Sequence, residues 1–203
     1  MSAPESVSAP ELGAMHAELA GIRLEACSAD IVEVSARCGR AADLAALARE
    51  MGSPLPAFGR AAIAGGRLAL CVRPERWLLL EARAPAGTTA ALWQAACAGY
   101  GVAVDLSSGL AALHLAGAAA RAMLARTCRL DLDPCVFAQG VAAATIMAQV
   151  PATLASLPSG LLLLTPSTTA RHLREWLAAA GKAFGLSSEP DLTLAELLGR
   201  DCR

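Results

Sequence analysis

Asp105 is the carboxylate in this sequence whose neighbours would best support chemistry. It lies near the end of an apolar stretch, 102–106, and is followed by Ser107 and Ser108. A carboxylate partly withdrawn from water at a strand end can have a shifted pKa and act as an acid or a base. The same spacing favours an Asx turn, in which the carboxylate accepts hydrogen bonds from the backbone amides of the two serines. We favour the turn, and therefore expect Asp105 to hold the chain in place rather than to react.

A second pair of carboxylates, Asp131 and Asp133, stands on either side of Leu132 and before Pro134. Two carboxylates separated by one residue could contribute to a cation site, but a calcium loop needs more oxygen ligands than this segment offers. Aspartate side chains also bond to nearby backbone amides in turns. We expect this pair to stabilise its loop.

The three histidines are His16, His114 and His172. None has a Cys, Asp or Glu at the spacing typical of a metal site or of a catalytic triad. His114 lies in an apolar strand, where we expect a histidine that is hydrogen-bonded in the core or at its edge. The histidines therefore predict neither a metal site nor a catalytic residue.

The seven cysteines are odd in number and include no Cys-x-x-Cys pair: Cys27, Cys38, Cys71, Cys97, Cys128, Cys135 and Cys202. This pattern argues against a disulfide framework and against a zinc knuckle. Free cysteine packs as a small buried hydrophobe, which is the role we expect here. Free thiols also fit a reducing cytoplasm.

Neither a phosphate loop nor a stacking platform is evident. Gly65-Gly66 lacks the third glycine and the lysine of a phosphate-binding loop and is instead typical of a hairpin turn. Trp77 and Trp176 are expected in the core. Trp93 lies in a segment with little charge, and it is our candidate for an anchor at a subunit interface.

The composition is unusually apolar. The chain has 203 residues and a net charge of −1, with 55% hydrophobic and 17% charged residues. A near-neutral chain is not an electrostatic partner for nucleic acid or for an anionic membrane. The apolar excess has two interpretations: alanine that tolerates exposure, or a large buried subunit interface, where charge is depleted. The N-terminal residues include Glu5 and Glu11 and lack a signal-peptide pattern, and no stretch is long enough to predict a membrane helix.

Hydrophobic periodicity predicts pairs of strands that lead into helices. The strands are expected at 22–26, 31–35, 67–73, 77–81, 102–106, 110–115, 140–149, 151–157 and 161–165, and the helices at 40–51, 88–100, 118–127, 169–184 and 194–198. This order predicts an α+β fold of ferredoxin-like units, with a mainly antiparallel sheet and helices on one face. We expect a flexible N-terminal arm at 1–20, one domain at 21–186, and a C-terminal tail with a short helix at 187–203.

The segment 102–134 also resembles a known family. It contains Asp105-Leu106-Ser107, then Gly117, a helix that ends in Leu-Ala-Arg-x-Cys at Cys128, and the run 130–134 followed by Phe137. These residues resemble the gamma subunit of heterotetrameric sarcosine oxidase. The run 73–79 and the helical pair Trp176-Leu177 are also similar to that family. More distantly, the pattern is similar to the folate-binding fold of the glycine-cleavage T-protein.

The resemblance implies an accessory chain without an active site, packed against alpha, beta and delta subunits. Such a complex oxidatively demethylates sarcosine or a related N-methyl or secondary amino acid, and carries FAD, FMN, NAD and tetrahydrofolate on its other subunits. The alternative is a stand-alone folate-binding or aminomethyltransferase-like protein. Folate enzymes of this fold carry an acidic residue in the hairpin after the strand at 140–149, whereas residues 148–165 contain no Asp or Glu. We therefore expect no catalytic, cofactor-binding or metal-binding residue in this chain.

Overall fold

The computed structural model describes residues 21–200, which form two mainly antiparallel sheets. The strands of sheet A are β1 (Arg23–Ser28), β7 (Leu110–Ala116), β8 (Ala142–Met147), β9 (Val150–Leu157), β10 (Gly160–Pro166), β11 (Ser187–Ser188) and β12 (Leu192–Thr193). Those of sheet B are β2 (Asp30–Ala36), β3 (Arg60–Ala64), β4 (Arg67–Arg73), β5 (Arg76–Glu81) and β6 (Gly101–Asp105). The spatial orders are β11-β1-β7-β10-β9-β8, with β12 also on β1, and β3-β4-β5-β2-β6.

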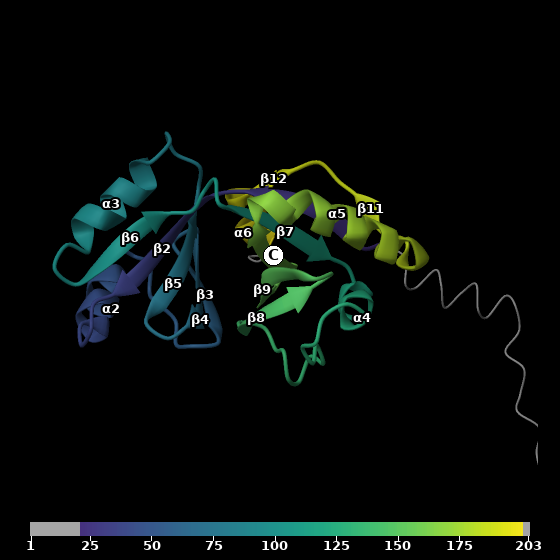
Figure 1. Cartoon of the computed structure of the whole chain (residues 1–203), viewed down its shortest axis with the longest axis horizontal. Helices are drawn as coiled ribbons and strands as arrows, with labels where there is room; N and C mark the ends of the chain where they lie inside the picture. Colours follow the sequence, from purple (N-terminus) through teal and green to yellow (C-terminus); the bar gives the residue numbers. More distant parts are fainter. Residues whose placement is uncertain (1–20, 201–203) are drawn as a thin grey trace, which may run out of the picture.

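The helices lie mainly on the outer faces of the two sheets. They are α2 (Ala41–Glu50), α3 (Thr88–Ala96), α4 (Ala120–Ala125), α5 (Ser167–Gly181) and α6 (Leu194–Arg200), with a 3-10 turn η1 (Lys182–Phe184) after α5. Leu44 and Trp93 pack α2 and α3 on sheet B, and Met123 and Leu177 pack α4 and α5 on sheet A. Sheet B with α2 and α3 occupies one half of the molecule, and sheet A with the other helices occupies the second half (Figure 1). The α+β class with antiparallel sheets is thus confirmed.

A third core lies between the two sheets. Leu70 and Leu80 of sheet B and Leu162 and Leu164 of sheet A belong to it, together with Leu197 of α6. Such a core requires strands that are apolar on both faces, and β4, β5 and β10 are continuous apolar runs for this reason. Part of the apolar excess in the composition is therefore explained by side chains that are buried between the two sheets of this chain.

Two pairs of consecutive strands cross between the sheets instead of pairing with each other. β1 lies in sheet A and β2 in sheet B, with only Ala29 between them. β6 and β7, the two strands of the segment singled out in the sequence, are divided in the same way by the turn at 106–109. The turn was expected from sequence, but the sheet that each strand joins was not, because it depends on partners far along the chain.

The C-terminal residues belong to the fold of sheet A. β11 and β12, which sequence analysis missed because each has two residues, pair in parallel with β1. The short terminal helix was expected and is present as α6, where Leu194, Leu197 and Leu198 are buried. β3 was also missed, although Gly65-Gly66 forms the predicted turn and joins it to β4. The arm predicted at 1–20 lies outside the described residues.

Two hairpins have the same two-residue turn but different residues in it. Gly65 and Gly66 have φ of 56° and 74°, and Ala148 and Gln149, between β8 and β9, have φ of 50° and 66°. A turn with positive φ at both central positions favours Asn or Gly, and an alanine or glutamine there is strained. The β8–β9 hairpin therefore carries local strain that the β3–β4 hairpin avoids.

Gln149→Gly is expected to raise the free energy of unfolding by about 0.5–1 kcal/mol, because relief of about 1–2 kcal/mol of left-handed strain outweighs the extra freedom of glycine in the unfolded chain. Urea unfolding followed by circular dichroism would measure this. The matched control is Gly66→Ala, whose Cβ meets no atom within 4 Å and whose cost would be backbone strain alone. A Gln149→Gly variant less stable than wild type would contradict the prediction.

Candidate functional site

Asp105 forms the Asx turn that its sequence favours. The Ser107 amide donates to the Asp105 Oδ1 atom at 2.9 Å, and the Ile31 amide donates to Ser107 Oγ at 3.0 Å. The hydrogen bonds from the side chain and backbone of Ser107 lower the pKa of Asp105. A carboxylate with a lowered pKa remains ionised and is a poor general acid or base near neutral pH. Asp105 therefore supports the crossover between the sheets.

Asp131 and Asp133 form two successive turns of the same kind. The Asp133 amide donates to Asp131 Oδ1 at 3.0 Å, and the Cys135 amide donates to Asp133 Oδ1 at 2.7 Å. The predicted loop-stabilising role is confirmed. Within residues 21–200, no group of three or more His, Cys, Asp or Glu side chains could hold a metal ion.

The six cysteines within residues 21–200 are free, and three of them have the buried position expected for each: Cys27, Cys71 and Cys97. Cys128 is only partly buried, and Cys38 and Cys135 are exposed, contrary to the prediction of a buried role. Burial, with a smaller contribution from the charge of Glu25, raises the pKa of Cys27 to about 12. This thiol is therefore neutral and unreactive at ordinary pH.

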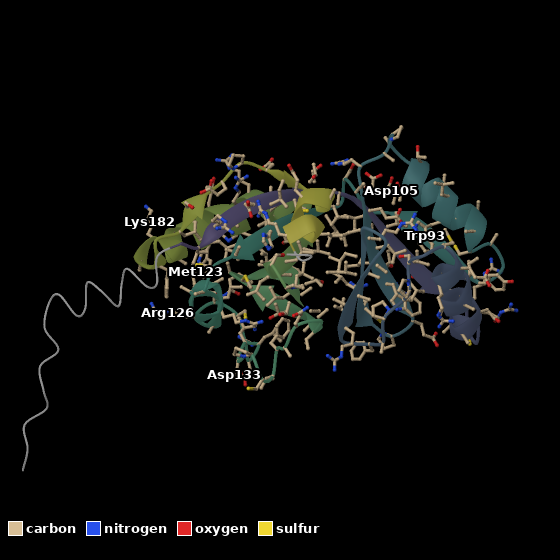
Figure 2. All side chains as sticks on the ribbon, turned by 180° about the vertical axis from the view of Figure 1, so that it is seen from behind. Trp93, Asp105, Met123, Arg126, Asp133 and Lys182 are labelled. Carbon is tan, nitrogen blue, oxygen red and sulfur yellow. The ribbon has the colours of Figure 1, made fainter. Side chains whose placement is uncertain are left out.

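Trp93 is a core residue, which contradicts its predicted role as an interface anchor. Its side chain is 1% exposed, and its Nε1 atom donates to Glu81 Oε1 at 2.7 Å. Figure 2 shows Trp93, a residue of α3, within the half of the molecule built on sheet B. Only Thr89 and Trp93 of α3 are buried, whereas the neighbouring Leu92 is 64% exposed and faces outward. The indole cannot reach a partner without unfolding the helix.

The densest polar site joins Glu25, His114 and Arg200. Arg200 donates from Nη1 and Nη2 to both carboxylate oxygens of Glu25 at 2.7–3.0 Å, and His114 Nδ1 lies 3.1 Å from Glu25 Oε2. Glu25 is 3% exposed and His114 is 0% exposed. Burial alone would raise the pKa of Glu25, but the hydrogen bonds and charges of Arg200 and His114 outweigh it and lower that pKa. The network fastens α6 to β1.

The hydroxyl of Ser159 extends this network, so that a serine, a histidine and a carboxylate follow one another as in the catalytic triad of serine hydrolases. Ser159 Oγ lies 3.4 Å from His114 Nε2, on the opposite side of the ring from Glu25. Two features argue against catalysis. Both oxygens of Glu25 already accept hydrogen bonds from Arg200, so the carboxylate is shared between the guanidinium and His114 instead of serving the histidine alone. His114 is also fully buried, and the 3.4 Å separation is long for proton transfer. The arrangement is a structural polar network.

Sequence reasoning missed this network because its members are far apart. Glu25 and His114 are 89 residues apart, and Arg200 lies 175 residues from Glu25. Glu25 and His114 are directly opposed in the pairing of β1 with β7. An ionisable residue inside an apolar strand is a signal of a buried partner, and both residues carried it, but the signal does not identify the partner.

An apolar cleft opens between the inner faces of the two sheets. Its volume is about 210 Å³, and its lining includes Leu78 and Val72 of sheet B and Pro151 and Leu164 of sheet A. Its one carboxylate, Glu33, pairs with Arg76 at 3.4 Å. A pocket for a drug-sized ligand usually has about 300–1,000 Å³ and a few free polar groups. The cleft is thus too small for a whole folate, and its acidic group is already paired.

The comparisons with known proteins identify the family. A family model described as the sarcosine oxidase, gamma subunit family matches residues 37–166, well over half of the chain. The chain belongs to the sarcosine oxidase gamma subunit family. The resemblance seen in the sequence is therefore confirmed. A search of curated protein sequences gave no match.

Two solved structures have similar folds. One is the heterotetrameric sarcosine oxidase from Corynebacterium sp. U-96 in complex with pyrrole 2-carboxylate, with a TM-score of 0.71 and 28% identity over 86% of this chain and 93% of that chain. The other is the glycine cleavage system aminomethyltransferase T from Bartonella henselae, with a TM-score of 0.61 and 16% identity. The likeness covers 87% of this chain and only 49% of the aminomethyltransferase, and it shows a common fold.

Proposed function

We propose that this chain is an accessory gamma subunit, without an active site of its own, in a heterotetrameric sarcosine oxidase-like complex. The observation that carries the proposal is the match to a chain of a heterotetrameric sarcosine oxidase over 93% of that chain's length, together with membership of the gamma subunit family. The other members of the complex are alpha, beta and delta subunits. The complex oxidatively demethylates sarcosine or a related N-methyl or secondary amino acid.

The chemistry belongs to the partner chains in this proposal. FAD, FMN, NAD and tetrahydrofolate are carried there, and the complex is cytoplasmic. In support, Asp105, Asp131 and Asp133 are engaged in turns, His114 contacts Glu25, and the inter-sheet cleft does not fit tetrahydrofolate. No helix within residues 21–200 has the length and apolar character to cross a membrane.

Co-expression of the chain with the products of its neighbouring genes tests the proposal. The expected result is one complex that contains this chain, an identified flavoprotein and the visible absorbance of flavin. A flavoprotein that assembles without this chain would overturn the accessory-subunit assignment. Titration of the isolated chain with tetrahydrofolate tests the alternative of a stand-alone folate protein, for which saturable binding is required.

A further inference from the structure

A basic pocket lies beside the strained β8–β9 hairpin, at the outer end of sheet A. We call it the hairpin pocket. Three segments form it: the end of α4 with the residues after it, the hairpin, and the outward side of α5. Its volume is about 470 Å³, and its lining is Arg126, Thr127, Arg129, Ile146, Ala148, Gln149, His172 and Trp176.

The charge of the hairpin pocket is positive and uncompensated. Of the described residues that line it, none is Asp or Glu. Arg126 and Arg129 are exposed, and neither forms an ion pair within residues 21–200. Arg126 lies over the ring of Phe184, 5.0 Å from its centroid. Figure 2 shows Lys182 at the same end of the molecule as Arg126, which adds to the positive charge there.

The pocket also presents apolar surface on a rigid frame. Ile146 is 58% exposed, and Trp176, which also lines the pocket, is partly buried. An isolated bridge between Cys128 and Met147 ties the residues after α4 to β8, and the His172 ring nitrogen Nε2 lies 3.2 Å from the Ala148 carbonyl oxygen. These contacts hold the turn at Ala148 and Gln149 in its strained conformation. Strain of this kind is concentrated at binding and catalytic sites.

We propose that the hairpin pocket is a docking site for an acidic segment of another subunit of the complex. The inference rests on the proposed function and assigns a surface to it. Arginine and tryptophan are enriched at the centres of protein interfaces, and an arginine without an internal partner binds a carboxylate strongly. A carboxylate of the partner meets Arg126 and Arg129, and an apolar side chain beside it covers Ile146. A partner chain fits better than a free anion because the exposed isoleucine requires apolar contact as well as charge.

Charge reversal in the assembled complex tests the pocket. Arg126→Glu and Arg129→Glu are each co-expressed with the partner subunits, and the amount of this chain retained with the identified flavoprotein is measured at low and high salt. We expect each variant to lower retention at least 10-fold, because a repelled carboxylate is worse than a missing contact. Retention of the wild-type chain should weaken as salt rises, since salt screens the attraction. Unchanged thermal melting of the isolated variants would confirm that they fold.

Arg49→Glu is the matched control, since Arg49 is also exposed but lies at the end of α2 on the opposite half of the molecule. If it lowers retention as much as the pocket variants, net charge and not the pocket is responsible, and the inference is wrong. Variants that assemble as well as wild type also overturn it but leave the proposed function intact. A wild-type chain that fails to assemble overturns both. If instead the isolated chain is a dimer that Arg129→Glu dissociates, the occupant is a second copy, which contradicts the proposal.

Discussion

Arg200→Ala is expected to destabilise the folded chain by about 3 kcal/mol at pH 7, because removal of one partner leaves a buried, ionised carboxylate without its main counter-charge. Glu25 has a side chain 4% exposed, and Arg200 supplies hydrogen bonds to both of its oxygens. The estimate is at the low end of the range for broken buried pairs because the Arg200 side chain is 36% exposed and His114 still contacts Glu25. Urea unfolding followed by circular dichroism would measure the loss.

The loss should depend on pH in a defined direction. In the wild-type chain the pKa of Glu25 is lowered on folding, so its ionised form contributes stability above the unfolded pKa of about 4.3, and this contribution is lost as pH falls through the folded value. In Arg200→Ala, the guanidinium no longer offsets the effect of burial, so the pKa of Glu25 rises above its value in the wild-type chain. The difference in stability between the two proteins should therefore shrink from pH 7 toward pH 4.

Arg171→Ala is the matched control for this prediction. Arg171 also pairs with a glutamate, Glu175, at 2.8 Å, but its side chain is 90% exposed. An exposed pair of this kind contributes little because water screens it, so this variant should unfold almost as the wild type does. A loss below 1 kcal/mol for Arg200→Ala, or one that does not change with pH, would show that the network does not hold α6 in place.

Trp93→Ala is expected to lower the free energy of unfolding by about 3–5 kcal/mol, since it removes a buried aromatic side chain and leaves a cavity. Trp93→Phe keeps most of the ring but loses the hydrogen bond to Glu81, at a cost of about 1 kcal/mol or somewhat more. Thermal or urea unfolding of the isolated chain measures both effects. They require no partner subunit, because the contacts of Trp93 lie inside this chain.

Leu92→Ala is the control on the same helix. Its side chain is 64% exposed, and its substitution should change stability by less than about 0.5 kcal/mol. An interface anchor at Trp93 would give the opposite pattern: Trp93→Ala would keep its stability but fail to assemble with the partner subunits. That result would reject the buried placement of Trp93.

Local features of the fold were predictable because short segments determine them. The strand at 67–73 and the helix at 40–51 follow from hydrophobic periodicity, and they appear as β4 and α2 within one or two residues at each end. The turn at Asp105 and Ser107 was predictable for the same reason, since its hydrogen bond joins residues two apart. Predictions failed at β11 and β12, whose two-residue pairings with β1 give no periodic signal.

By itself, the sequence determined the α+β class, the family through the segment 102–134, and the absence of an acidic residue from 148–165. Only the tertiary structure decided the roles of individual side chains. It removed Trp93 from the surface, brought Glu25 to Arg200, and gathered Arg126 and Arg129 beside the β8–β9 hairpin. The physical reason is common to all three: burial and ion pairing depend on residues far apart in the chain, and periodicity and spacing report only on neighbours.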